Sequence, residues 1–233
     1  MFGSMFLSCT KAAQWRRLVL IGLALFLLPR LGQAHVLDVD LSKLSRTDIV
    51  LTYLRVGFTH ILPLGLDHIL FVVSLYLLEP RVRAVLWQVT AFTVAHSITL
   101  GLAIYGLIAP PAALVEPIIA LSILFVALEN IIIARLNPWR LAVVFGFGLI
   151  HGMGFASALT SVGLPRASFL ESLIAFNVGV ELGQVSVILL LYLLIGRWFA
   201  TKPWYKQRIV IPASVAIGLI AAYWTVARIF FPA

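Results

Sequence analysis

The chain has 233 residues, of which 62% are hydrophobic and only 11% are charged, and its mean hydropathy is +1.06. A soluble domain carries about a quarter charged residues, so this composition excludes an ordinary soluble protein. A net charge of +8 would suggest nucleic-acid binding in a soluble protein, but here the basic residues stand in short stretches between apolar runs. The composition therefore predicts an all-α, polytopic membrane helix bundle whose partner is the lipid bilayer and not nucleic acid.

The first 34 residues have the pattern of a secretory signal peptide. Basic residues precede an apolar run at 18–28, which is too short for a span of about twenty residues, and Pro29 ends it. Small residues at Gly32 and Ala34 then offer a cleavage site. We expect residues 1–34 to be removed, with an uncleaved anchor as the alternative. Cleavage would also remove the single cysteine, Cys9, and leave the mature protein without a thiolate ligand.

The rest of the chain divides into a polar lead-in and a membrane domain. Residues 35–55 are too polar to span and predict an extracytoplasmic lead-in segment. Residues 56–233 predict one six-helix transmembrane domain, with a homo-oligomer left open. Its six apolar runs each approach the length that a bilayer requires, and they lie at 57–78, 84–107, 112–134, 141–163, 169–195 and 209–230.

Arginine and lysine are distributed unevenly between the connections of these runs. The second and fourth connections hold only Arg166. Because basic residues favour the cytoplasmic side, we expect the other three connections to be cytoplasmic in a bacterial inner membrane, with the mature N-terminus and the C-terminus outside. Those three connections contain Arg81, Arg83, Arg135, Arg140, Arg197, Lys202, Lys206 and Arg208.

Several polar side chains interrupt the apolar runs, where an ionisable group costs several kcal/mol and usually marks a functional interior. We select eight of them as candidate metal ligands: His60, Asp67, His68, His96, His151, Asn177, Glu181 and Gln184.

Spacing along each predicted helix suggests which of these side chains meet. His60 and Asp67 are seven residues apart, so a continuous first helix would place them on nearly the same face. Depth counting places Asp67 near the membrane midplane and His60 near its outer face, with Glu129 nearer the inner face. Arg228 is the only ionisable residue of the sixth run, which we therefore expect to be peripheral. The remaining midplane residues are His68, His96, His151 and Glu181.

Breaks and small residues support the same location for a site. Pro63 interrupts the first run just before the candidate ligands, which is typical of broken helices at ion sites. Two G-x-x-x-G spacings, Gly148 with Gly152 and Gly179 with Gly183, predict closely packed helices around it. Imidazole and carboxylate without thiolate suit divalent Ni, Co, Zn or Cu. For any single histidine, a hydrogen bond between helices is the simpler interpretation.

Four segments, in order, are similar to the HupE/UreJ family of hydrogenase and urease accessory membrane proteins. The resemblance covers about residues 57–190 and implies nickel permeation. In that family a His-x5-Asp-His element is linked to metal handling, and here it reads His60-x6-Asp67-His68, which suggests a divergent subgroup. A His-Gly-x-x-His-Gly pattern is reduced to His151-Gly152-Met153-Gly154. The segments are GFTH with GLDH at 57–68, FTVAHSITL at 92–100, GFGLIHG at 146–152 and FNVGVELGQ at 176–184.

The sequence thus favours a permease for a divalent transition-metal ion, as a transporter rather than an enzyme. An intramembrane hydrolase is an alternative, although the chain contains no H-E-x-x-H or G-x-S-x-G motif. A haem-binding protein with paired histidines is another.

Overall fold

A computed structural model describes residues 45–133, 137–162 and 168–231. Every regular element in these ranges is helical, so the predicted all-α class is confirmed. They belong to one compact unit, Leu37–Ala233. The predicted signal peptide and residues 35–44 of the predicted lead-in lie outside the described residues, as do Arg135 and Arg166.

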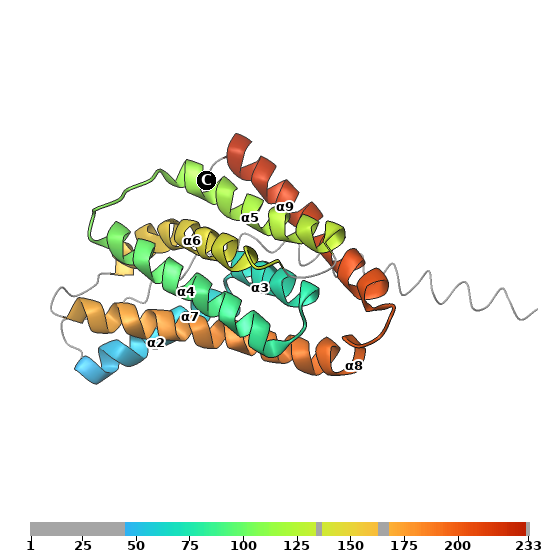
Figure 1. Ribbon diagram of the computed structural model, residues 1–233. Helices are drawn as coiled ribbons and strands as arrows, with labels where there is room; N and C mark the ends of the chain where they lie inside the picture. Colours follow the sequence, from blue (N-terminus) through green and yellow to red (C-terminus); the bar gives the residue numbers. More distant parts are fainter. Residues whose placement is uncertain (1–44, 134–136, 163–167, 232–233) are drawn as a thin grey trace, which may run out of the picture. The chain divides into compact units, whose positions relative to one another are not determined.

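Figure 1 shows the helices in chain order. α2 begins after Ser45, whose hydroxyl accepts a hydrogen bond from the Asp48 backbone N–H at 3.2 Å, and α5 begins after Pro111. The elements are α2 (Arg46–Ile61), α3 (Leu66–Leu78), α4 (Val82–Ile104), α5 (Ala112–Ile132), α6 (Arg140–Val162), α7 (Phe169–Leu191), the π-helical turn η4 (Tyr192–Gly196), α8 (Arg197–Phe199), the π-helical turn η5 (Lys206–Val210) and α9 (Ile211–Phe230).

The first apolar run is not one straight helix. α2 and α3 meet at an angle of 66°. Between them Pro63 has no N–H to donate, and a Cβ on Gly65 would overlap the backbone oxygen of His60. The predicted interruption is confirmed, but the expectation that His60 and Asp67 share the face of a continuous helix is wrong. α2 also begins at Arg46, within the segment that the sequence assigned to the lead-in.

The predicted spans are partly reproduced. α4 and α5 are long and apolar enough to cross a membrane, and so are the continuous helical stretches Phe169–Phe199 and Lys206–Phe230. The bent pair of α2 and α3 gives a fifth span if it is counted as one. The run predicted at 141–163 corresponds to α6, within which Arg140–Ala156 forms a shorter apolar stretch.

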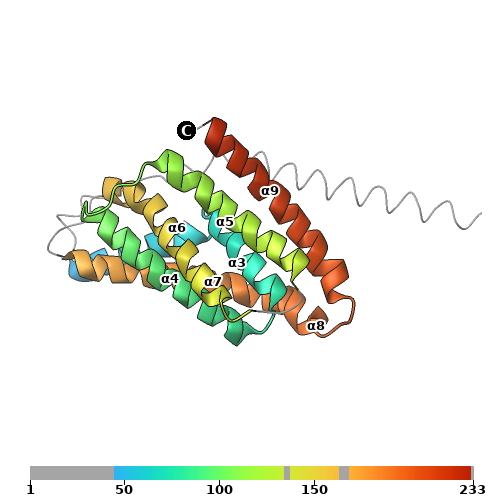
Figure 2. The same ribbon diagram turned by 45° about the horizontal axis from the view of Figure 1, so that its top comes forward.

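Close packing of small residues brings the helices together in pairs. α4 packs most extensively on α6, α2 on α7, and α5 on α9 (Figure 2). Any Cβ on Gly148 or Gly152 would overlap the backbone of α4, and one on Gly179 would overlap the backbone of α2. A Cβ on Gly183 would press on the Ile61 side chain. Both G-x-x-x-G spacings therefore mark close helix contacts, as predicted.

The described parts of the basic connections gather at one end of the bundle, here called the basic end. The Lys206 ammonium donates to the Ile133 carbonyl oxygen at 2.9 Å, and residues 77–81 border the same hollow as residues 200–206. At the opposite end the rings of Tyr105 and Phe169 are 4.3 Å apart. The basic end thus collects connections that are far apart in the sequence.

A candidate metal site of four histidines

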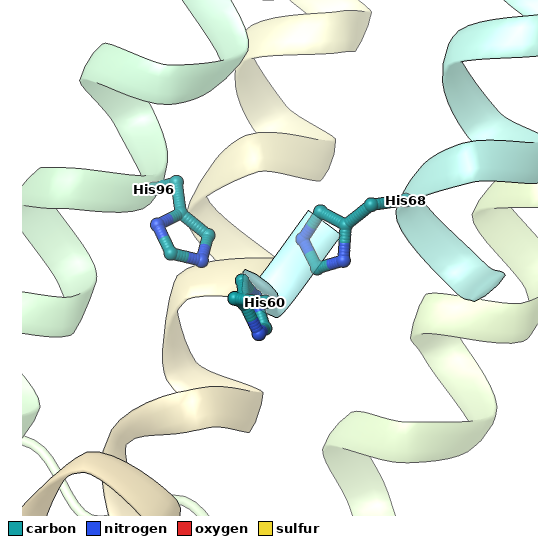
Figure 3. A group of neighbouring side chains, drawn as sticks. All are labelled: His60, His68 and His96. Atoms are coloured by element: carbon teal, nitrogen blue, oxygen red, sulfur yellow. The ribbon is translucent and has the colours of Figure 1, made fainter. Parts of the chain in front are cut away.

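Four histidines from four helices meet inside the bundle. His60 ends α2, His68 lies in the first turn of α3, His96 is on α4 and His151 is on α6. The ring centroids of His68 lie 4.6 Å from His60, 5.9 Å from His96 and 5.1 Å from His151. His60, His68 and His96 each offer one ring nitrogen, and these three nitrogens lie within 4.8 Å of one another (Figure 3). These three side chains form the centre of the candidate site.

The break between α2 and α3 creates this grouping. His60 and His68 belong to different helices, and the bend turns their rings into edge contact. His60 therefore lies beside His68 and His96, and the depth count that separated it from them near the outer face is wrong. The count assumed a straight helix, whose rise of about 1.5 Å per residue no longer applies across the bend.

Each imidazole keeps one buried ring nitrogen without a hydrogen-bond partner. These atoms are Nε2 of His60, His68 and His96, and Nδ1 of His151. His68, His96 and His151 are at most 6% exposed. Buried polar atoms are normally paired, so four unpaired imidazole nitrogens in one place form a set of donors that could hold a metal ion.

Asn177 orients one of these rings. Its side-chain oxygen lies 3.4 Å from Nδ1 of His96 and can only accept a hydrogen bond. Its amide nitrogen donates to the Leu173 carbonyl at 2.8 Å, which fixes the orientation of the amide group. The His96 proton therefore resides on Nδ1, and the lone pair of Nε2 faces the other histidines. Supporting contacts of this kind orient metal-binding histidines in proteins.

Ser122 on α5 does the same for His151. The serine hydroxyl donates to the Ile119 carbonyl at 2.7 Å, so it accepts from Nε2 of His151 at 2.9 Å. The lone pair of His151 is then on Nδ1, which has no partner. Sequence reasoning missed Ser122, since a serine at that depth carries no signal of its own.

Asp67 stands next to His68 in the chain but is engaged elsewhere. Its carboxylate accepts two hydrogen bonds from Nη2 of Arg228, at 2.8 and 3.1 Å. The last helix, which the sequence predicted to be peripheral, thus brings Arg228 to the carboxylate next to His68 in the chain. A lone arginine in an apolar helix is itself a sequence signal for such an ion pair, since a charge at membrane depth requires a partner.

Glu181 and Gln184 contact α4 rather than the imidazole rings. The Thr90 hydroxyl donates to Glu181 at 2.5 Å, and the Thr93 hydroxyl donates to Gln184 at 2.9 Å. Their spacing of four and seven residues would place Asn177, Glu181 and Gln184 on one face of α7, yet among them Asn177 alone is paired with a histidine in the described structure. One oxygen of Glu181 and the amide nitrogen of Gln184 remain buried without partners.

Aromatic rings enclose the histidines on both sides. Phe155 contacts His60 with ring centroids 3.9 Å apart, and Phe176 lies 5.3 Å from Phe155. On the other side, Phe71 and Phe92 lie 5.4 and 5.0 Å from the ring of His151. Low polarity around the site strengthens electrostatic interactions within it.

Comparison with known proteins identifies the family of the chain. No curated protein and no solved structure matches the chain. A family model described as HupE / UreJ protein matches residues 37–228, which include all four histidines and Asp67. The chain is a membrane protein and belongs to the HupE/UreJ family.

Proposed function

We propose that the chain is a membrane permease for a divalent transition-metal ion, with nickel as the first candidate substrate and cobalt as the second. The observation that carries this proposal is the convergence of three imidazoles, two buried and one half-buried, whose ligand nitrogens lie within 4.8 Å of one another. Neutral imidazole suits nickel, cobalt, zinc and copper, and family membership favours nickel among them.

The charge of the ion needs compensation at this depth. Neutral imidazoles offset none of it, whereas Asp67, which directly precedes His68 in the first turn of α3, carries a carboxylate. In our proposal Asp67 stabilises the dication electrostatically. Asn177 orients His96, and Glu181 and Gln184 support the path. None of these last three residues is one of the three central ligands. An inside-negative membrane potential would favour inward movement by about 2.3 kcal/mol per charge per 100 mV.

The orientation is part of the proposal. We place the basic end on the cytoplasmic side of a bacterial inner membrane, because the arginines and lysines gathered there follow the positive-inside rule. The C-terminus is then outside. Removal of residues 1–34 as a signal peptide agrees with that orientation.

The geometry disfavours haem as an alternative ligand. His60 and His68 are in edge-to-face contact at 4.6 Å, and His68 and His151 are at 5.1 Å. A porphyrin ring cannot lie between rings that touch each other. The hydrolase alternative gains no support from the described residues.

Two measurements on one protein test the permease. Detergent-purified protein from cells grown with nickel, cobalt or zinc is analysed for bound metal, and proteoliposomes report uptake of the same ions. We expect one bound ion per chain in the parent and loss of both binding and uptake in His60→Ala/His68→Ala/His96→Ala. Asp67→Asn should retain the fold and lose at least tenfold in uptake.

Ser186→Ala is the matched control, since its hydroxyl donates to the Leu182 carbonyl oxygen within the same helix. Binding and uptake of this variant should equal those of the parent. A parent protein that moves none of these ions would refute the permease.

A further inference from the structure

Three layers of side chains follow one another from the histidines toward the basic end. Along α4 the order is His96, Phe92 and Gln88, with one helical turn between successive residues. The distance from the first to the last layer is about 12 Å along this helix. α6 contributes His151, Phe147 and Arg140, and α5 contributes Ser122 and Glu129.

The middle layer is aromatic. Phe71 lies 5.1 Å from Phe92 and 6.0 Å from Phe147, measured between ring centroids. The first two rings are at most 1% exposed. An apolar layer of this kind keeps water and hydrated ions from passing between the histidines and the basic end for as long as the helices that carry its rings stay together.

The third layer is ionic. Nη1 of Arg140 lies 2.9 Å from Oε2 of Glu129, and Nε donates to the side-chain oxygen of Gln88 at 3.0 Å. The Arg140 and Glu129 side chains are only 2% and 4% exposed. One cluster of contacts therefore ties together α4, α5 and α6, the helices that also carry His96, Ser122 and His151.

This buried pair is incompletely satisfied. Oε1 of Glu129 and Nη2 of Arg140 have no hydrogen-bond partner. Burying two charges costs about as much as their attraction returns unless further hydrogen bonds complete the geometry. Such a pair adds little net stability relative to two hydrated groups, so it can separate at small cost only when the separation lets water reach both charges.

A second arginine–carboxylate pair lies on the other side of the histidines. Arg228 holds Asp67 at 2.8 Å and also donates to the Glu116 carbonyl at 3.1 Å, so it joins α9 to α3 and α5. Glu116 lies near the start of α5 and Glu129 near its end. The two pairs thus face opposite ends of the bundle, with the histidines between them.

We infer that Arg140 with Glu129 and Arg228 with Asp67 are the two gates of the metal path, and that they open in turn. This inference rests on the proposed permease and adds to it the residues that control access. A closed pair neutralises the carboxylate that would attract a dication and places a guanidinium in its way. Opening one pair at a time exposes the histidines to one side of the membrane without making a continuous pore.

Cysteine accessibility tests the gates without requiring metal movement. In a Cys9→Ser background, Ser122→Cys places a near-isosteric thiol beside His151. A cationic, membrane-impermeant methanethiosulfonate is applied to right-side-out and to inside-out vesicles. A separate Thr201→Cys variant, with an exposed thiol at the basic end, reports which vesicles present that end.

Arg140→Gln should speed modification of Ser122→Cys at least tenfold from the basic end and leave the rate from the opposite end unchanged. Arg228→Gln should show the reverse. Arg140→Lys and Arg228→Lys retain the charge and should remain as protected as the parent. Because the double variant Glu129→Gln/Arg140→Gln leaves no uncompensated charge, it should reproduce the effect of Arg140→Gln even if the single variant folds poorly.

Equal rates in the parent and in the double variant, or acceleration from both ends by either arginine substitution, would overturn the gates. Failure of the permease itself would appear separately, as absent metal binding and uptake in the parent, while sided accessibility could still be measured.

Discussion

Asp67 and Arg228 are 161 positions apart in the chain and form an ion pair in which one guanidinium nitrogen contacts both carboxylate oxygens. The pair is about a quarter exposed, with 23% for the arginine and 26% for the aspartate side chain. It joins the first turn of α3, beside His68, to the end of α9. The last helix is therefore tied to the helix that carries His68.

Arg228→Ala is expected to impair the protein. It leaves Asp67 partly buried without its counter-ion, which should destabilise the fold by roughly 1–3 kcal/mol, less than for a fully buried pair. Thermal unfolding of the purified protein measures this, with Ser186→Ala as the neutral comparison. Arg228→Lys should recover part of the loss. An unfolding midpoint of Arg228→Ala equal to that of the parent would mean that the pair contributes nothing.

The sequence predicted the helical class, the membrane location and the candidate residues, because apolar run length and polar residues at membrane depth are local signals. Helical periodicity failed at the first run, since it cannot anticipate a 66° bend. That bend also bears on the family motif. The longer spacing of His60-x6-Asp67-His68 falls partly in the non-helical residues Leu62–Gly65, where an added residue need not rotate a helix face.

The partners of each polar side chain could not be predicted from the sequence. Asn177, Glu181 and Gln184 share a stripe by spacing, yet the crossing of α7 with α4 decides that only Asn177 reaches a histidine. Likewise, nothing local to Ser122 shows that it faces His151. Such contacts depend on the packing of several helices, which G-x-x-x-G spacing indicates without giving the register.

Asn177→Leu should weaken metal binding by about 10–100-fold while His96 remains in place. The substitution removes the acceptor for the Nδ1 proton of His96, so the ring loses its preferred tautomer and orientation. Equilibrium dialysis with nickel and cobalt measures the affinity, and Ile174→Leu on the same helix is the control because that side chain is 55% exposed. Unchanged affinity in Asn177→Leu would show that the amide does not orient a ligand.

Gly152→Ala and Gly146→Ala form a matched pair on α6. A Cβ at Gly152 would overlap the His96 carbonyl oxygen and the Thr99 hydroxyl, whereas one at Gly146 meets nothing within 4 Å. We expect Gly152→Ala to separate α4 from α6 and lower both stability and metal affinity. Gly146→Ala should be neutral or stabilising by about 0.5–1 kcal/mol, since alanine favours a helix over glycine. Equal effects of the two substitutions would contradict close packing at Gly152.

The orientation predicts sided labelling by an impermeant thiol reagent in intact cells of a Cys9→Ser strain. Pro110→Cys, in the connection between α4 and α5, should be labelled from outside because that connection lies away from the basic end. Lys202→Cys at the basic end should be labelled only after the membrane is permeabilised. The opposite pattern would reverse the orientation while leaving the fold unaffected.

Phe155→His should tighten metal binding. The family pattern His-Gly-x-x-His-Gly, aligned on His151, has its second histidine at the position of Phe155. That ring already lies 3.9 Å from His60, so an imidazole there would add a further ligand at the site. An added ligand worth about 1.4 kcal/mol corresponds to a tenfold lower dissociation constant. Because a more tightly held ion leaves more slowly, uptake at saturating metal should fall while binding improves.

Phe155→Leu, which removes the ring without adding a ligand, should show neither change. Weaker binding in Phe155→His than in Phe155→Leu would mean that the nitrogens at His60 do not form the metal site.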